Sequence, residues 1–519
     1  MNVKLFFLKK SNLALIAILI LGLFLRVYLI EKNSFWEDEA VTATAVKNYS
    51  TLEILRNTLA YGNVTPEYFP KVAIDLPFYF ILLSFWSKLF GISELSLRLL
   101  SALSGSFSVL MLFLIAKQLA DRKIALLSSF IFSLSMVHIQ FSQEARHYSL
   151  LTFIALLSAY FFIRSFKGGK ILDLTMFAIL TVIGLYTHFP YVFFVAFQGL
   201  YTLAMIKLDP RHAKKIIIVF LFVGLLYLPL LPRLLSQETS TQAYVTKFIG
   251  QPNIISITKV WFLLNTWIYP SAELRHNIYT LNFFGFAVHD WLLIISAFLL
   301  VFLMTALFAI GIFSYKLSKS RKIRHLRKKW ILMPLIWFFA PFSLQFLLSV
   351  LHPTAKVFGP ISYLLFIFPA YIMLVSVGIL SLKQKYSAMA IILIVLFSLL
   401  PLASYYTNVN KQQWREVAMF MKENLDEGEA ILLNSPYMEV AFDYYYGNYN
   451  GLYPVHNATQ AAEASKNRNS FWLILSFDKY FDPQGEIRSY LEKEYMLERE
   501  EDFFDIKVLH YSRRFSKIN

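Results

Sequence analysis

Eleven apolar runs, each long enough to cross the roughly 30 Å hydrocarbon core of a bilayer, constrain this chain more than any other feature. Hydrophobic residues make up 57% of the sequence and charged residues only 16%, whereas soluble domains carry about 25% charged residues. We therefore expect the bilayer to be the solvent of this protein, which excludes disordered and collagen-like chains. The runs lie near residues 13–30, 98–116, 124–141, 148–163, 171–187, 190–206, 216–231, 291–315, 330–350, 359–380 and 387–403.

A twelfth apolar stretch, Leu76 to Phe90, is too short and too polar for a span. It holds about 15 residues, against roughly 17–25 in a spanning helix, and Ser84, Ser87 and Lys88 interrupt it. Its apolar residues are rich in Phe, Tyr and Trp, which favour the membrane–water interface. We predict a helix that lies on the bilayer surface.

The distribution of basic residues predicts the orientation of the spans. A net charge of +16 would suggest nucleic-acid binding in a soluble protein, but in a membrane protein Lys and Arg gather in cytoplasmic loops. With a cytoplasmic N-terminus, the opposite short loops keep little that is basic beyond Arg146 and Lys356, and a crossing by 76–90 would reverse every later basic loop. Anionic membrane lipid thus accounts for the basic excess, and no nucleic-acid partner is expected. The cytoplasmic basic residues are Lys4, Lys9, Lys10, Lys117, Arg122, Lys123, Arg164, Lys167, Lys170, Lys207, Arg211, Lys214, Lys215, those of the run 316–329, Lys383 and Lys385.

This topology divides the chain into a membrane domain, residues 1–403, and an extracytoplasmic tail, residues 404–519. Loops 31–97 and 232–290 also lie outside. The first apolar run has no small-residue cleavage site after it, so we expect a retained helix rather than a removed signal peptide. The tail alternates helical spacing with short apolar runs, which predicts a small α/β domain. Its helices are expected near 412–425 and 486–494, and its strands near 430–433, 471–477 and 506–510.

Three consecutive carboxylates, Glu37, Asp38 and Glu39, follow the outward end of the first run. At a membrane surface they could supply a general base and a partner for a cation or a hydroxyl group. A solvated helix start also explains them, because acidic side chains favour the first turn of a helix. These residues alone leave both interpretations open.

A second polar cluster, Ser142-Gln-Glu-Ala-Arg-His-Tyr148, connects two apolar runs on the same side. Glu144, Arg146 and His147 bring a carboxylate, a guanidinium and an imidazole to the membrane edge, where such groups are costly and tend to be functional. The alternative is an ordinary turn with interfacial anchoring. So many polar residues in so short a loop between two apolar runs favour a functional role.

Three isolated groups are weaker candidates on the same side of the membrane. His188 ends an outward helix, where a packing role also explains it. Arg98 and Lys356 could bind a lipid phosphate or extend to ordinary headgroups. The gathering of these groups with the carboxylates on one side is the strongest functional indication from the residues themselves.

The chain contains no cysteine, which excludes a disulfide framework, a thiolate metal site and a cysteine nucleophile. A divalent cation could bind beside Glu37, Asp38, Glu39 and a histidine, yet no ligand spacing requires one. We therefore expect no obligatory cofactor and leave a divalent cation open.

Five short motifs follow one another in the first half of the chain: Trp36-Glu-Asp-Glu-Ala40, Asp75-Leu-Pro-Phe-Tyr-Phe80, Phe90-Gly-Ile-Ser-Glu-Leu-Ser-Leu-Arg-Leu-Leu-Ser-Ala102, Ser142-Gln-Glu-Ala-Arg-His-Tyr-Ser149 and Tyr186-Thr-His188. In this order they resemble the multi-spanning glycosyltransferases of the GT-C superfamily. The branch they resemble most contains bacterial relatives of the protein O-mannosyltransferases and the lipid A aminoarabinose transferase. The resemblance is dense over residues 10–235 and thinner through 363–370 and 413–416. Each motif is weak alone, but five in one topology form a strong signal.

The resemblance implies an all-α polytopic GT-C fold with an interfacial helix in the first outward loop. It implies an enzyme of the bacterial inner membrane that moves a monosaccharide, hexose or pentose, from a polyprenyl-phosphate carrier to an extracytoplasmic glycan, lipid or protein with inversion. Asp38 matches the family's catalytic base, and Glu39 matches a neighbour that orients the acceptor or the base. Glu144 and Arg146 match the second outward-loop motif, which faces the same cavity.

Such a single displacement suits these residue types. Asp38 would take the proton of the acceptor hydroxyl, and a nearby carboxylate would stabilise the oxocarbenium-like transition state. Arg98, Arg146 and Lys356 are the candidate cations for the leaving phosphate. The full set expected to contact substrate is Glu37, Asp75, Arg98, Glu144, Arg146, His147, His188 and Lys356.

Two positions depart from the family pattern. Many relatives read His-Pro-Pro where this chain has Asp75-Leu76-Pro77, and many carry an Arg where it has Ser362. Both departures put the contacts to the donor phosphate, and hence the identity of the donor, in question. Lys356 could replace the missing Arg, a hypothesis that unchanged donor affinity in a Lys356→Ala protein would contradict.

Two other classes of function compete with the transferase. A transporter or flippase of lipid-linked saccharide predicts charges near the bilayer midplane and broken helices. The long runs are nearly free of mid-helix charge, and no inverted hydropathy symmetry is evident. A membrane-anchored assembly or sensor protein would leave both polar motifs unexplained. The transferase is therefore favoured.

Overall fold

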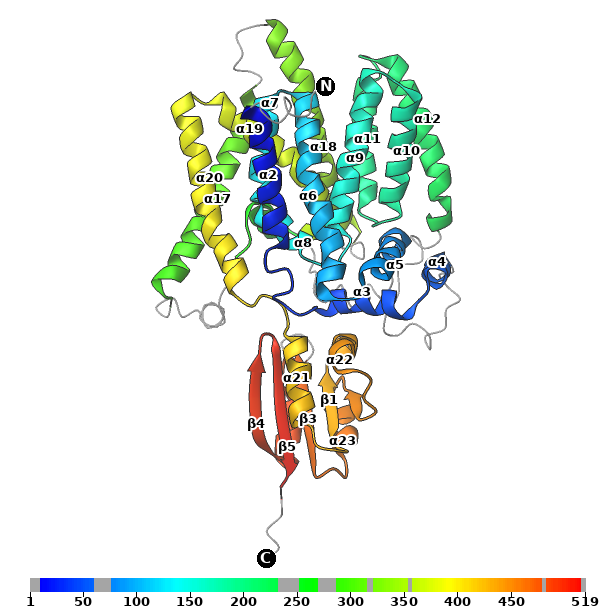
Figure 1. Cartoon of the computed structure of the whole chain (residues 1–519), viewed down its shortest axis with the longest axis vertical. Helices are drawn as coiled ribbons and strands as arrows, with labels where there is room; N and C mark the ends of the chain where they lie inside the picture. The colour runs from blue at the N-terminus through cyan, green and yellow to red at the C-terminus, as the bar shows by residue number, and fades with distance from the viewer. Residues whose placement is uncertain are drawn as a thin grey trace, which may run out of the picture.

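The structure, a computed structural model, describes residues 10–59, 76–231, 252–268, 286–314, 321–352, 357–477 and 482–514. Long helices form a bundle, and a smaller sheet with its own helices lies beyond one end of that bundle (Figure 1). Helix α3 (Glu37–Asn48) runs across this end, between the bundle and the sheet. The first outward loop is therefore in a position to contact both parts.

The bundle is built from helices that coincide with the eleven expected runs. In the described part, seven helical segments are long and apolar enough to cross a membrane, and a bent pair makes an eighth. The three remaining runs fall on the shorter apolar helices α2 (Lys10–Val27), α10 (Ile171–Leu185) and α11 (Tyr191–Met205). The seven are α6 (Glu94–Leu119), α9 (Tyr148–Lys167), α12 (Pro210–Tyr227) with η1 (Leu228–Leu230), α17 (Val288–Phe313), α18 (Arg321–Leu351), η4 (Ile361–Ile367) with α19 (Phe368–Ser381), and α20 (Gln384–Thr407).

The run at 124–141 is not the uninterrupted segment that its composition suggested. It forms two helices, α7 (Arg122–Ser133) and α8 (Met136–Ser142), which meet at 62°. The guanidinium of Arg26, at the end of α2, donates to the carbonyl oxygens of Phe132 and Ser133 at 3.4 and 3.3 Å. A break inside a bilayer is tolerated only where other groups satisfy the freed backbone, and this buried arginine does so.

Helices α17 and α19 cross at close range through two glycines. A Cβ atom on Gly311 would collide with the carbonyl oxygen of Leu374, and one on Gly378 would collide with that of Leu307. Because lipid tails are as apolar as leucine, close packing at small residues is a main source of helix association in membranes. This crossing thus depends on the absence of two side chains.

Replacing Gly378 by alanine is therefore expected to lower the thermal unfolding midpoint of the detergent-solubilised protein. The added methyl meets rigid backbone, and overpacking of this kind costs about 1–3 kcal/mol. Gly224→Ala is the matched control, because a Cβ there meets no atom within 4 Å. Equal midpoints for the two variants would contradict the close crossing.

Three helices occupy the first outward loop: α3, α4 (Thr51–Leu59) and α5 (Pro77–Phe90). Helix α5 covers the stretch expected to lie on the bilayer surface, and it begins with a proline and ends at Gly91, whose φ is +79°. Tyr79 and Phe80 are buried on one side of it, whereas Phe85 and Leu89 are exposed on the other. This one-sided apolar exposure suits an interfacial helix, and the location at the interface stays a prediction.

An additional helix, α15 (Ile254–Asn265), lies in the loop expected outside the bilayer. The indole of Trp261 donates to Thr305 of α17 at 2.8 Å, and Tyr371 of α19 donates to the amide oxygen of Asn265 at 2.6 Å. Part of the loop 232–290 therefore packs along the bundle instead of projecting from it. The sequence interpretation did not anticipate this helix.

The tail carries a five-stranded mixed sheet in the order β2-β1-β3-β5-β4. Strand β1 pairs in parallel with β2 and β3, whereas β5 pairs antiparallel with β3 and β4. The expected helices and strands are all present, and the division of the chain at residue 403 stays a prediction. The elements are α21 (Trp414–Asn424), β1 (Ala430–Asn434), η5 (Pro436–Met438), α22 (Glu439–Tyr446), β2 (Leu452–Pro454), α23 (Ala458–Ser465), β3 (Ser470–Ser476), α25 (Glu486–Glu494), β4 (Tyr495–Phe503) and β5 (Ile506–Arg513).

The two faces of this sheet bury different partners, because successive side chains of a strand point to opposite faces. Leu432 and Leu473 pack in one core with the helices that cover the outer face. Ile431, Leu433 and Ile474 belong to another core, which continues into residues of α3, α5 and α6. The tail thus shares an apolar core with the end of the bundle.

Candidate active site

Glu39 forms the centre of a buried ionic network at the start of α3. Its side chain is 0% exposed, and its carboxylate accepts hydrogen bonds from Nε and Nη2 of Arg98, both at 2.8 Å. The backbone N–H of Ala145 at 2.8 Å and Nζ of Lys411 at 2.9 Å complete its partners. Burial by itself would raise the pKa of Glu39, but Arg98 and Lys411 outweigh it and lower that pKa to about 2.

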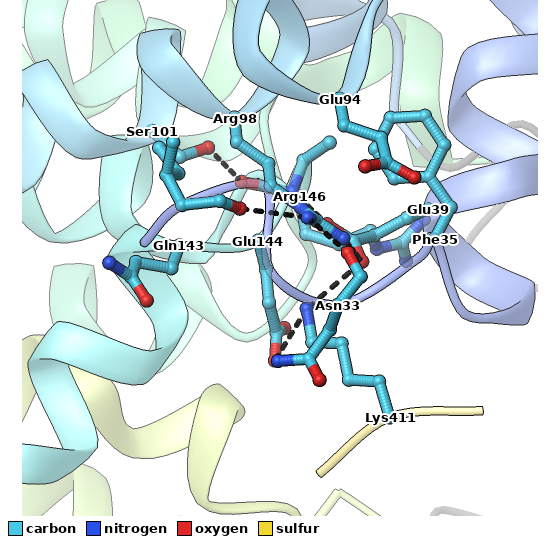
Figure 2. A network of polar contacts seen from close by, with 12 residues as sticks. Asn33, Phe35, Glu39, Glu94, Arg98, Ser101, Gln143, Glu144, Arg146 and Lys411 are labelled. Atoms are coloured by element: carbon cyan, nitrogen blue, oxygen red, sulfur yellow. Dashed lines mark hydrogen bonds and ion pairs between the residues drawn. The ribbon is translucent and has the colours of Figure 1, made fainter. Parts of the chain in front are cut away.

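Arg98 is fully occupied by contacts within the protein. Besides its two bonds to Glu39, it donates through Nη1 to the carbonyl oxygens of Ile30 and Asn33 at 2.8 and 2.7 Å, and through Nη2 to that of Ser34 at 3.1 Å. A guanidinium has five N–H donors, so none is left over for a phosphate. Figure 2 shows Arg98 directed from α6 at the first loop. This geometry argues against the donor-phosphate contact expected for Arg98.

Asp38 has a different environment from its neighbour Glu39. Its side chain is 37% exposed, and Nη2 of Arg146 lies 3.7 Å from its carboxylate. Nη1 of Arg146 donates to the hydroxyl of Thr42 at 3.3 Å, one turn further along α3. The acidic triplet does begin a helix, as one interpretation held, but it is not uniformly solvated. The carboxylate of Asp38 is therefore accessible from the surface, whereas that of Glu39 is not.

Two further carboxyl groups have pKa values near neutrality. Burial, and the charge of Asp38, raise the pKa of Glu37 to about 8 against the opposing effect of Arg146. Burial raises the pKa of Glu144 to about 7, although Lys411 opposes this shift. These groups can therefore exchange protons in the neutral range, unlike Glu39.

His147 and His188 meet at the same end of the bundle. Their ring centroids are 4.2 Å apart, and His188 is 4.8 Å from the ring of Tyr363. Burial, His188 and Arg146 hold the pKa of His147 well below its usual range, so this imidazole is neutral. The two rings and Tyr363 form an aromatic cluster, in which His147 adds no positive charge.

Asp75 and Lys356 lie outside the described residues. No three His, Asp or Glu side chains in the described ranges are arranged to hold a metal ion. The cation left open from the sequence therefore has no ligand set among these residues.

Sequence reasoning did not single out Lys411 or Gln143. Gln143 donates to the carbonyl oxygen of Tyr28 at 2.8 Å and accepts from the hydroxyl of Tyr405 at 2.8 Å, which ties α2 and α20 to the second motif. Gln143 lies within the second motif, directly before Glu144, so its position in the sequence could have identified it as a site candidate. Lys411 lies in a polar stretch just before the weak resemblance at 413–416, and nothing local distinguishes it from other lysines.

Residues 71–235 match the family model described as dolichyl-phosphate-mannose-protein mannosyltransferase. A protein from Aquifex aeolicus (strain VF5), described as uncharacterized, is 32% identical over 166 residues, a match that spans 31% of this chain and 31% of that relative. Residues 71–235, the part matched by the family model, contain the second motif and helix α5.

Solved structures resemble almost the whole chain. The Archaeoglobus fulgidus oligosaccharyltransferase matches 92% of this chain and 71% of its own with a TM-score of 0.55 at 11% identity. ArnT from Cupriavidus metallidurans matches 96% of this chain and 97% of its own with a TM-score of 0.53 at 12% identity. ArnT bound to undecaprenyl phosphate gives a TM-score of 0.50 at 12% identity, over the same shares of both chains. The resemblance to the GT-C glycosyltransferases that the five motifs predicted is confirmed.

Proposed function

We propose that this protein transfers a monosaccharide from a polyprenyl-phosphate carrier. It is a multi-pass membrane protein of the GT-C fold, and its residues 71–235 match the dolichyl-phosphate-mannose-protein mannosyltransferase family. The likeness to an ArnT structure bound to undecaprenyl phosphate supports this class of donor. The acceptor is an extracytoplasmic lipid, glycan or protein. An acceptor peptide and a dolichol phosphate are bound in structures of the archaeal oligosaccharyltransferase, which supports a site open to both substrates.

The observation that carries the proposal is the contrast between Asp38 and Glu39. Glu39 accepts four hydrogen bonds and is held ionised, so it positions the first turn of α3 and takes up no proton. Asp38, which precedes Glu39 in the chain, is 37% exposed and lies beside Arg146. A reaction that needs a base in the substrate's reach and a cation close to it finds both here.

The proposed reaction is a single displacement at the anomeric carbon. Asp38 accepts the proton of the acceptor hydroxyl as its oxygen bonds to the anomeric carbon, while the bond from that carbon to the phosphate oxygen breaks with inversion. The departing phosphate carries negative charge and is stabilised by Arg146, whose side chain is 8% exposed. The neutral His147 and its neighbour His188 line the same end of the bundle.

The proposed topology places this chemistry outside the cytoplasm of a bacterial cell. Eleven crossings with a cytoplasmic N-terminus put the basic loops inside and the tail outside. Helix α6 starts at Glu94, which pairs with Arg415 of the tail, and extends 26 residues, or about 39 Å, to its other end near Lys117. The site and the basic loops therefore belong to opposite membrane surfaces.

The direct test uses purified wild-type protein with undecaprenyl phosphate that carries a radiolabelled hexose or pentose. Lipid, glycan and protein fractions of a bacterial envelope are supplied as acceptors and separated after incubation. We expect the label to leave the carrier and to appear in one fraction. A complete lack of donor consumption with every sugar would contradict the proposed function.

The break between α7 and α8 is the one observation that favours the alternative, a flippase for lipid-linked saccharide, because transporters often use broken helices. Arg26 fills this break from the last turn of its helix, not from mid-span. A flippase in sealed vesicles would move the intact carrier-linked sugar to the opposite leaflet. Recovery of translocated but uncleaved donor would support that alternative.

A further inference from the structure

Lys411 reaches the carboxylate network from the tail, far along the chain from every other member. Its Nζ atom lies 2.9 Å from Oε2 of Glu39 and 3.9 Å from Oε1 of Glu144, and its side chain is 10% exposed. Figure 2 shows Lys411 on a backbone segment separate from the helices, with its side chain directed at Glu39 and Glu144. The ammonium group therefore bridges the first motif and the second.

The backbone around Lys411 is fastened on both sides. The side chain of Asn33 donates to the amide oxygen of Asn410 at 3.0 Å, and the hydroxyl of Ser34 donates to the carbonyl oxygen of Gln412 at 2.6 Å. The side chain of Gln412 bonds in turn to Ser476, at the end of β3. The placement of Lys411 thus depends on the docking of the tail sheet against the first loop.

The two carboxylates depend on Lys411 to different degrees. Glu39 keeps a bidentate arginine and a backbone N–H if the ammonium is removed. For Glu144, Lys411 is the one cation within 4 Å among the described residues. Loss of the ammonium should therefore affect the charge of Glu144 far more than that of Glu39.

Among the described residues, the charged groups that act on Glu144 besides Lys411 are acidic, and the side chain of Gln140 adds a hydrogen bond that lowers the pKa of Glu144. Glu39 and Asp38 of α3 are both acidic and raise its pKa, as burial does. Tyr79 of α5 and Tyr405 of α20 also face it and are neutral phenols. With Lys411 in place, the pKa of Glu144 is about 7. Without Lys411, it would rise further.

We propose that the tail completes the active site through Lys411, a positioning residue that pairs with Glu144 and favours its ionised form beside Asp38 and Glu39. This inference rests on the proposed function and deepens it, because transfer then requires the docked tail as well as the membrane helices. An ionised Glu144 supplies a second carboxylate for the acceptor hydroxyl and for the positive charge of the transition state. A tail that has lost its contacts with Asn33 and Ser34 withdraws the ammonium and switches the site off.

The test compares Lys411→Met with Lys411→Arg and with Lys466→Met, an exposed lysine of the same tail. At pH 7 we expect kcat of Lys411→Met to fall about fivefold, because the acidic limb of its pH profile moves up by about one unit from about 7. Removing a cation favours the protonated carboxyl, so activity should recover towards pH 9. Lys411→Arg should retain the wild-type profile, and Lys466→Met should not differ from wild type. A loss of the same factor at every pH would overturn the proposal.

A second measurement separates this inference from the proposed function. Folding raises the pKa of Glu144 from its ordinary value of 4.5 to about 7. The contribution of this group to the free energy of unfolding therefore falls as pH rises between these two values, and it is smallest above about pH 7. Lys411→Met should therefore lower the thermal midpoint more at pH 9 than at pH 6, and this difference should vanish in a Glu144→Gln background. If wild-type protein transfers no sugar but shows this pattern, the proposed function fails while the Lys411–Glu144 coupling stands. A pH-independent drop that persists with Glu144→Gln would mean a merely structural lysine.

Discussion

Replacing Asp38 by asparagine is expected to lower kcat for sugar transfer by about 10²–10⁴-fold, the usual contribution of a general base. The amide has nearly the same shape as the carboxylate, but it cannot accept the acceptor's proton. The side chain of Asp38 is 37% exposed, and Nη2 of Arg146 lies 3.7 Å from its carboxylate. The thermal midpoint should change little, because this contact is long and partly solvated. Donor turnover in detergent, with KM and kcat determined separately, measures the effect.

Glu37→Gln is the matched comparison for Asp38→Asn. The pKa of Glu37 is about 8, so this group is mostly protonated at pH 7 and an amide resembles it closely. We expect a loss smaller than tenfold at pH 7. A larger loss in Glu37→Gln than in Asp38→Asn would move the role of base to Glu37. Full activity of Asp38→Asn would remove the proposed mechanism.

Replacing Arg98 by methionine is expected to destabilise the protein by about 3–5 kcal/mol, because it leaves the buried Glu39 with one partner charge fewer. Three backbone carbonyl oxygens, those of Ile30, Asn33 and Ser34, lose their donor at the same time. The first loop and α3 should therefore detach before the bundle unfolds. Thermal unfolding and limited proteolysis within 31–59 measure this loss.

The companion variants show whether Arg98 acts through Glu39. Arg98→Lys keeps the charge but loses the bidentate geometry, so it should recover only part of the stability. The double variant Arg98→Met with Glu39→Gln removes both charges and should be more stable than Arg98→Met alone. An Arg98→Met protein with wild-type stability and a raised donor KM would instead restore the donor-phosphate role expected from the sequence.

The sequence anticipated that the acidic triplet and the second motif lie close together. The positive-inside pattern assigned the acidic triplet and the second cluster to the same side of the membrane. In the structure the backbone of Ala145 bonds to Glu39, and Arg146 approaches Asp38. This part was predictable because membrane topology depends on composition and charge along the chain, and both are local properties.

Other features required the fold. Composition did not distinguish the broken pair α7–α8 from a continuous span, because the groups that satisfy the break come from Arg26 on another helix. Arg98 looked available for a phosphate until its donors could be assigned to carbonyl oxygens of the first loop. Lys411 carried no local signal at all. Each of these depends on contacts between segments that are distant in sequence.

The sequence by itself determined where the apolar helices of the eleven expected runs lie, because a bilayer forces every apolar run to satisfy its own backbone hydrogen bonds as a helix. It determined neither the break between α7 and α8 nor helix α15. It also determined the strands β1, β3 and β5 through their apolar runs. Only the tertiary structure distinguished the environments of the two neighbouring carboxylates, Asp38 and Glu39. Asp38 and Glu39 are chain neighbours of similar chemistry, but each residue of a helix turns by about 100° from the last. That rotation directs Glu39 into the network of Arg98 and Lys411 and leaves Asp38 partly exposed beside Arg146.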